Sequence, residues 1–181
     1  DRLFAANLPV LVLDVVRHVV KEFNLSLNEL HNDSTSVSFY GAYENASEEA
    51  KRGKRTRLAI TFGHSKDHRP DLKQLLYILT VTDDGGVPVY FTSASGNVTD
   101  DTTHRETWDL LRQLVGHADF LYVADCKLAT RENLQYIHNQ DGRFVTILPR
   151  TRREDAEFRQ RLLTNLDAVS WEHLYDVTND K

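Results

Sequence analysis

Two aspartates stand where a carboxylate could take part in chemistry, Asp33 and Asp125. Asp33 lies in "HNDSTSVSFYG", at the mouth of or within a predicted strand, a setting in which strand propensity disfavours aspartate. Asp125 ends the apolar run "ADFLYVAD" just before a predicted helix, and ligands of open α/β sheets gather at the carboxyl ends of strands. If the two strands are neighbours, the carboxylates meet across the sheet, and divalent cations between them relieve their repulsion. Such a pair would serve metal-assisted phosphoryl transfer.

The alternative for both aspartates is structural. Asp33 would then start an Asx turn, and Asp125 would cap the helix that follows it. Aspartate is common in both places, so the two residues taken alone favour this structural interpretation.

Basic residues are concentrated in one stretch, although the 181-residue chain has a formal net charge of −5. Between Lys51 and Lys73 there are eight Lys or Arg against two Asp. Within it, "GHSKDHRPDLKQ" places His64 and His68 four residues apart, a spacing used in metal sites, but Pro70 argues against the helix that would align them. A solvated loop is the simpler interpretation, and its cations suit contact with a phosphate backbone.

The remaining polar features have structural interpretations. "GNVTDDTTHRE" leads into a helix whose N-terminus could receive an anion, but Asp100 and Asp101 oppose that and favour capping. The single cysteine, Cys126, excludes an internal disulfide, suits a reducing cytoplasm and is interpreted as a buried small residue. The longest apolar run is well short of the roughly 20 residues that a membrane span needs, so none is predicted.

These residues are positioned by an alternation of predicted helices and strands. Antiparallel strands come first and βαβ units afterwards, which predicts an α/β fold with a mixed sheet between two layers of helices. The predicted helices cover 8–23, a segment after 99 with Trp108 and Leu111 on its apolar face, 130–139 and 153–166. The predicted strands cover 35–40, 57–62, 74–81, 87–94, 118–125 and 143–149. Residues 44–56 are predicted to form an exposed loop.

Four segments in order resemble the catalytic domain of DDE-type insertion-sequence transposases, and within these the IS4-like branch with an "SKDHRPDLKQ" segment. They are "HNDSTSVSFYGAYE", "FGHSKDHRPDLKQLLYILTVTDDGGVPVYFTSASGNVTDDTT", "FLYVADCKLATRENL" and "FVTILPRTRREDAEFR". The resemblance implies an RNase H-like fold in which two Asp and one Glu bind two Mg²⁺ or Mn²⁺ ions. Asp33 matches the first catalytic Asp and Asp125 the second, which reverses the preference for the structural interpretation.

The same resemblance implies a bacterial enzyme of the cytoplasmic nucleoid that cleaves and joins DNA, with a homodimer in the transposition complex. Lys66, Arg69, Lys73 and Lys127 are the expected DNA contacts. The expected domains are an N-terminal helical segment over 1–27, the catalytic core over 28–150 and the start of an inserted helical region over 151–181.

The third carboxylate of the family is not found in this chain. Glu154, Glu157 and Glu172 stand too early and in the wrong context. The absence of methionine and the first residue, Asp1, favour a fragment of a longer protein over a degenerate remnant. Such a fragment is expected to bind metal weakly and to be inactive alone. Two alternatives stay open, an RNase H-like nuclease without strand transfer and an inactive DNA-binding remnant.

Overall fold

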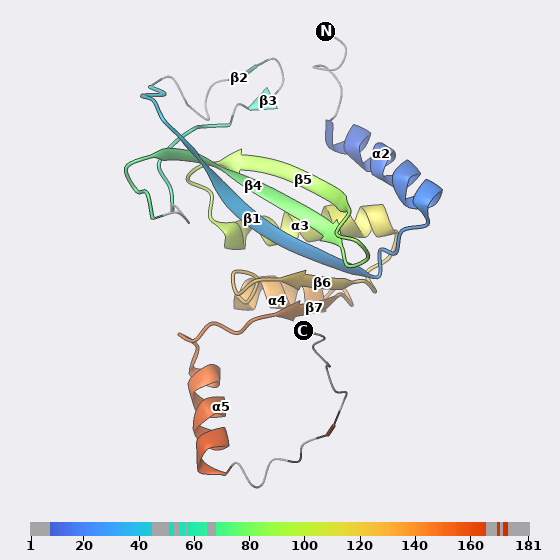
Figure 1. Ribbon diagram of the computed structural model, residues 1–181, viewed down its shortest axis with the longest axis vertical. Coiled ribbons are helices and arrows are strands. Elements are labelled where there is room, and N and C mark those ends of the chain that lie inside the picture. Colours follow the sequence, from blue (N-terminus) through green and yellow to red (C-terminus); the bar gives the residue numbers. More distant parts are fainter. Residues whose placement is uncertain are drawn as a thin grey trace, which may run out of the picture. The chain divides into compact units, whose positions relative to one another are not determined.

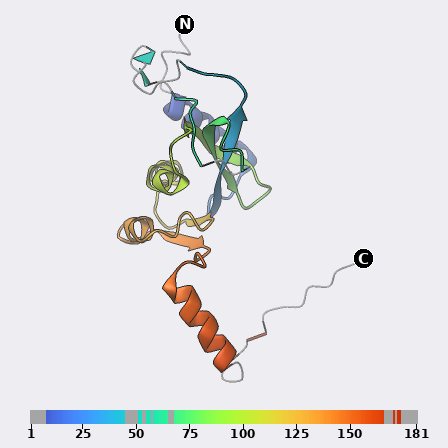
Figure 2. The ribbon, with the colours of Figure 1, turned by 90° about the vertical axis from the view of Figure 1, so that its left-hand side faces the viewer.

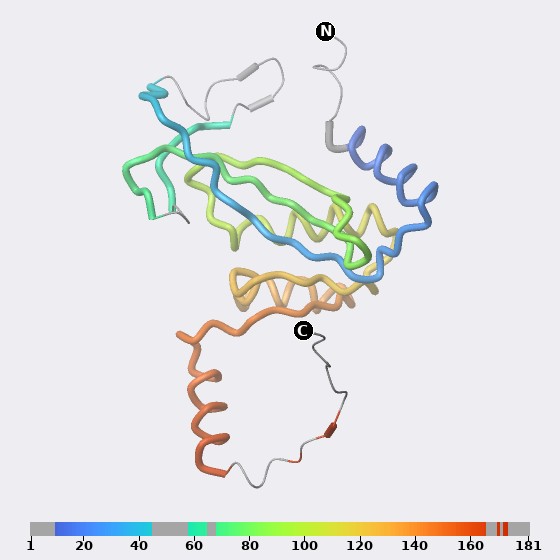
Figure 3. Tube along the Cα trace, viewed as in Figure 1, coloured from blue at the N-terminus to red at the C-terminus, as the bar shows by residue number. Residues whose placement is uncertain are grey.

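The computed structural model describes residues 8–44, 51–52, 55–56, 58–64, 68–165, 170 and 172–173. The chain divides into two compact units, Asp1–Ile147 and Leu148–Lys181, and each is described by itself. Figure 3 follows the course of the chain through both.

The first unit is built on a five-stranded mixed sheet (Figure 1). Its strands are β1 (Glu29–Phe39), β4 (Lys73–Thr82), β5 (Pro88–Ser95), β6 (Leu121–Ala124) and β7 (Arg143–Thr146). The order across the sheet is β5-β4-β1-β6-β7, in which β1, β4 and β5 pair antiparallel while β6 and β7 continue parallel to β1. An antiparallel meander joined to two parallel crossover strands is the arrangement of the RNase H-like fold, so the predicted fold class is confirmed.

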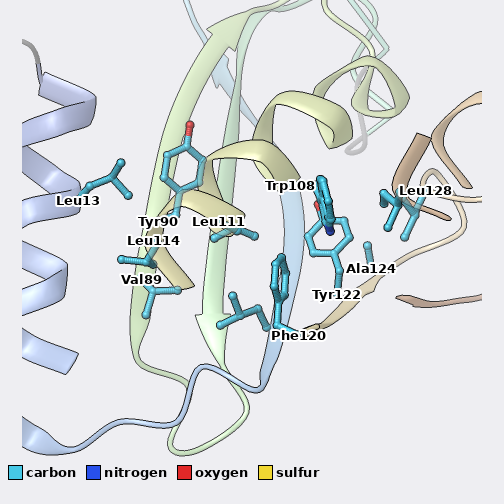
Figure 4. Close-up of a cluster of buried hydrophobic side chains, with 12 residues drawn as sticks. Leu13, Val89, Tyr90, Trp108, Leu111, Leu114, Phe120, Tyr122, Ala124 and Leu128 are labelled. Carbon is cyan, nitrogen blue, oxygen red and sulfur yellow. The ribbon is translucent and has the colours of Figure 1, made fainter. Parts of the chain in front are cut away.

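Helices α2 (Leu8–Phe23), α3 (Asp100–Val115) and α4 (Arg131–His138) contribute to one hydrophobic core with the sheet. Figure 2 shows α3 and α4 on the same side of the strands. Trp108, Leu111, Phe120 and Tyr122 are fully buried between α3 and β6, and Trp108 stacks on Phe120 with ring centroids 6.1 Å apart (Figure 4). No helix of the described part of this unit covers the other face, so the described residues supply two of the three expected layers.

Most predicted elements are present with bounds shifted by a few residues. The helix at 8–23 is α2, the helix after 99 is α3, and the hairpin is β4 and β5. Pro88 begins β5, which is an edge strand, as expected of a residue that has no N–H to donate to a neighbouring strand.

Three predictions in the first half of the chain were wrong. The strand predicted from Thr35 begins at Glu29. Its first residues were missed because Asn32 is polar by type, although its side chain is buried and donates to Thr80 Oγ1 at 2.9 Å. The predicted loop at 44–56 contains β2 (Lys51–Arg52) and β3 (Arg55–Thr56), which form a two-stranded sheet too short to show periodicity. Of the predicted strand at 57–62, the described residues 58–62 form one bridge, between Thr61 and Gln74, and Arg57 lies outside the described residues.

The second unit contains α5 (Arg153–Thr164), within the predicted helix at 153–166. None of its side chains is buried, and Phe158 is 54% exposed. Ion pairs one turn apart support it, Arg153 with Glu157 at 2.6 Å and Arg159 with Asp155 at 2.8 Å. Across the described residues, no helix combines the length and the apolar character that crossing a membrane requires.

Candidate metal-binding site

Asp33 and Asp125 lie at equivalent positions of two adjacent parallel strands. The last aligned pair of β1 and β6 is Asn32 with Ala124; Asp33 is the next residue of β1, and Asp125 is the residue directly after β6. Neighbouring strands are about 4.8 Å apart, and aligned residues of parallel strands point to the same face. Both carboxylates belong to one pocket of about 440 Å³.

The Asp125 backbone leaves the sheet through an Asx turn. Its Oδ1 accepts the backbone N–H of Lys127 at 2.9 Å, and its carbonyl oxygen accepts the hydroxyl of Thr146 at 2.6 Å. The helix cap that the structural alternative assigned to Asp125 is instead Thr130, whose side chain accepts the N–H of Asn133. Because the turn orients the side chain, Asp125 is held at the strand end with its carboxyl group exposed.

Asp33 lies inside β1, and the Asx turn assigned to it by the structural alternative is absent at this position. It is aligned with Leu79 of β4, and its exposed carboxylate accepts the N–H of the adjacent Ser34 at 2.7 Å. A strand interior gives aspartate no conformational advantage. Position 33 of β1 therefore carries a carboxylate although aspartate has a low strand propensity.

The pocket walls are largely apolar. Residues of β1, β4, β6 and β7 contribute, and its full lining is His31, Asn32, Asp33, Leu79, Val81, Val123, Ala124, Asp125, Val145, Thr146 and Ile147. Carboxylate oxygens are the ligands that Mg²⁺ and Mn²⁺ favour, so the donor set fits a hard divalent cation. No third carboxylate lines this pocket among the described residues.

A buried histidine lies behind the site, on the helical side of the sheet. His104 of α3 is 4% exposed and its Nδ1 is 3.0 Å from the Tyr122 hydroxyl of β6. Burial lowers the pKa of His104, and the negative charges of Asp125 and other nearby carboxylates partly oppose that effect. Burial also raises the pKa of Tyr122, and the charge of Asp125 adds to this. Both groups are therefore neutral at pH 7.

The structure places the predicted DNA contacts in different surroundings. Lys127 follows Asp125 by two residues and is exposed, whereas Lys66 lies outside the described residues. Arg69 pairs with Asp71 at 2.6 Å, and that hydrogen bond is the main cause of the raised pKa of Arg69. The Lys73 ammonium donates to the carbonyl oxygens of Ala42 and Tyr43. Neither Arg69 nor Lys73 lines the pocket.

The structure also shows the surroundings of Glu154 and Cys126, which the sequence analysis considered. Glu154 pairs with Arg152 at 2.8 Å, and a hydrogen bond from that guanidinium lowers the pKa of Glu154 to about 2. Cys126 is half-buried, not fully buried as predicted.

Sequence reasoning missed three polar residues of the pocket lining, His31, Asn32 and Thr146. The signal for His31 was its spacing, because residues two apart on a strand share a face with Asp33. Thr146 had no such signal, since only the pairing of β7 with β6 brings it beside Asp125.

No protein-family model matches the chain, and no curated protein sequence matches it. Solved structures similar to it include a pre-cleavage Mos1 transpososome, with 6% identity and a TM-score of 0.40 over 74% of this chain and 40% of that one. A Mos1 transposase paired-end complex with the left transposon end has 8% identity and a TM-score of 0.40 over 83% and 46%. A simian T-cell lymphotropic virus intasome in complex with PP2A regulatory subunit B56 gamma has 14% identity and a TM-score of 0.37 over 79% and 39%.

The chain spans less than half the length of each of these proteins. At such values the likeness concerns the fold alone. The IS4-like branch stays a prediction.

Proposed function

We propose that this chain is the metal-binding core of a DDE-type transposase, which cleaves DNA strands and joins them by phosphoryl transfer. The alignment of Asn32 with Ala124 carries the proposal, because it sets Asp33 and Asp125 side by side on the open face of the sheet. The Asx turn gives Asp125 a structural role, but it does not account for a second carboxylate beside it on β1 in the same pocket.

Asp33 and Asp125 would hold the divalent cations, two Mg²⁺ or Mn²⁺ in the complete site. When bound, the ions supply Lewis-acid polarisation of a phosphodiester and activation of the attacking oxygen. The chain itself positions the carboxylates through β1 and the Asx turn at Asp125. With two carboxylates, the cation is expected to bind weakly and the chain alone to be inactive, as the missing third ligand implies.

DNA is the proposed substrate because phosphodiesters are its reacting groups and their charge needs cations nearby. Lys127, exposed beside Asp125, is the described cation best placed to contact a backbone phosphate. The basic stretch from Lys51 to Lys73 would add contacts away from the pocket. A homodimer holding paired element ends in the bacterial nucleoid completes the proposal.

Titration with Mn²⁺ tests the metal site directly. Asp33→Asn and Asp125→Asn are each expected to weaken binding by at least about tenfold, since even an outer partner of a metal ligand is worth about that much. Asp119→Asn is the matched control, because Asp119 is exposed, precedes β6 at its other end and pairs with Arg143 at 3.3 Å. Equal affinity in the wild type and both site variants would overturn the proposal.

A strand-transfer assay on the intact protein separates the proposed activity from its rivals. A transposase joins a cleaved element end to target DNA, whereas a nuclease of the same fold yields cleavage products alone. An inactive DNA-binding remnant yields neither product but retains DNA in a mobility-shift assay. Either of these last two results would contradict the transposase assignment.

A further inference from the structure

We infer that Glu29, His31 and Asp83 form a second cation site, suited to a first-row transition ion such as Zn²⁺ and separate from the Asp33–Asp125 pair. The Nε2 atom of His31 lies 2.9 Å from Glu29 Oε1 and 3.6 Å from Asp83 Oδ1. All three potential ligand atoms lie within 4.8 Å of one another. In the described part of the chain, this is the one group of three such side chains that converge in this way.

The three side chains are brought together by the pairing of β1 with β4. Glu29 and His31 are two residues apart on β1 and therefore share a face. Asp83 follows the last residue of β4, and its N–H donates to the Glu29 carbonyl oxygen at 3.3 Å. This backbone hydrogen bond sets Asp83 against the start of β1.

The turn that carries Asp83 is itself held in place. Thr82 accepts at its hydroxyl the N–H of Val87 at 3.1 Å and donates that hydroxyl to the Asp84 carbonyl oxygen at 2.8 Å. The Thr82 N–H also donates to the Val87 carbonyl oxygen at 3.0 Å. The ligands thus come from a strand and a hydrogen-bonded turn, so little reorganisation would accompany ion binding.

The spacing and the donor types both fit a tetrahedral ion. Zn²⁺ bonds of about 2.0–2.2 Å place neighbouring ligand atoms about 3.3–3.6 Å apart, which matches the 3.6 Å between His31 and Asp83. The 2.9 Å between His31 and Glu29 is a hydrogen bond that would lengthen by a few tenths of an ångström when an ion enters. Two carboxylates balance the charge of a divalent ion, and imidazole selects Zn²⁺, Co²⁺ or Ni²⁺ over Mg²⁺. The side chains of His31, Glu29 and Asp83 are 41%, 37% and 67% exposed, so an ion can enter.

The bound ion would fasten the β4–β5 turn to the start of β1. Asp33, on the same face, is two residues further along the strand, about 6.6 Å away. His31 also lines the pocket of the proposed active site, so the second ion would lie beside it without sharing its carboxylates. The inference does not depend on the proposed function.

Calorimetric titration of the full chain with Zn²⁺ in excess Mg²⁺ tests the site, because Mg²⁺ competes for the two aspartates and not for imidazole. One Zn²⁺ per chain is expected. Asp83→Asn and His31→Ala should each weaken Zn²⁺ binding by at least about tenfold. Asp83→Asn lies in an exposed turn and preserves side-chain size, so it keeps the test valid if His31→Ala does not fold.

Two further variants locate the ion. His138→Ala, at an exposed position near the end of α4, should bind Zn²⁺ like the wild type, and so should Asp33→Asn. Co²⁺ bound in place of Zn²⁺ should show the visible absorption of a tetrahedral site, lost in Asp83→Asn. The inference is overturned if Asp83→Asn binds Zn²⁺ like the wild type. It is equally overturned if Asp33→Asn weakens Zn²⁺ as much as Asp83→Asn does, which would assign the ion to the other pocket.

Discussion

Asp33 and Asp125 have the same side chain but lie in two different backbone conformations. Asp125 uses an Asx turn, a conformation that aspartate favours, to end β6. Asp33 lies in a strand interior that disfavours it, beside the buried Asn32, which holds β1 against β4 through Thr80. Under the proposed function, the need for a carboxylate in the pocket outweighs this local propensity at Asp33.

The His104–Tyr122 pair shows how the helical side supports the same strand. The Tyr122 hydroxyl is the one partner found for the imidazole in the described residues, and His104 Nε2 is buried without another. Protonating this ring inside the core would place a charge where burial disfavours it.

Lowering the pH is therefore expected to destabilise the protein through His104. Its pKa is lowered in the folded state and is about 6.5 when unfolded, so below that value the unfolded chain binds more protons. The stability that His104 contributes is complete above about pH 6.5 and is lost as the pH falls toward the folded pKa. Urea unfolding of the wild type and His104→Asn between pH 7.5 and about 5 measures the difference.

His104→Asn should flatten the pH dependence, and His138→Gln, at an exposed position, should leave it unchanged. Parallel curves for the wild type and His104→Asn would show that another group carries the effect.

At the scale of elements, the connection between β6 and α4 determines the position of Asp125. The connection closes through backbone hydrogen bonds from Leu128 N to the Asp125 carbonyl oxygen and from Ala129 N to the Cys126 carbonyl oxygen. Thr130 then starts α4, with its side chain on the Asn133 N–H at 3.2 Å. The cap fixes the start of the helix and, with it, the length of the loop that carries Asp125 and Lys127.

Two N-cap threonines allow a matched comparison of that cap. Thr130 makes a side-chain cap hydrogen bond and Thr99, at the start of α3, makes none, although both have extended backbones. Thr130→Ala is expected to lower the free energy of unfolding by about 1 kcal/mol, and Thr99→Ala by a few tenths at most. Equilibrium urea unfolding of both variants checks this, and equal losses would show that the hydrogen bond does not set the difference.

At the scale of the whole molecule, the two faces of the sheet differ in what covers them. The helices bury one face. The register places the pocket and four exposed apolar side chains on the other, namely Val37 at 45%, Phe91 at 49%, Val145 at 52% and Ile147 at 69% exposure. Exposed apolar faces of this kind bind apolar molecules from solution.

The dye ANS is expected to bind this face and fluoresce. Replacing Val145 and Ile147 together with Thr should reduce the fluorescence while changing the free energy of unfolding by no more than about 1 kcal/mol, because both side chains are largely exposed. Leu163→Thr on α5, where the side chain is 84% exposed, is the control and should leave the signal unchanged. Undiminished fluorescence in the double variant would place the dye elsewhere.

The sequence by itself determined the elements whose pattern is local. The 3.6-residue period of α2 and α3 and the turn residues between β4 and β5 are properties of neighbouring residues, so these elements were found close to their observed bounds. The start of β1 was missed because Asn32 is polar by type and buried only through its partner on β4. The pattern raised the pairing of Asp33 with Asp125 as one of two interpretations, and the family resemblance made it the preferred one.

Tertiary structure decided which strands are neighbours and in what register. The alignment of Asn32 with Ala124, which places the two aspartates in one pocket, joins segments about ninety residues apart, and nothing local to either strand encodes it. The same holds for Asp83 beside Glu29 and His31, and for the face left without a helix in the described residues. The sequence specifies which side chain each position carries. The distance between two side chains far apart in the sequence follows from strand register and packing, which only the folded sheet defines.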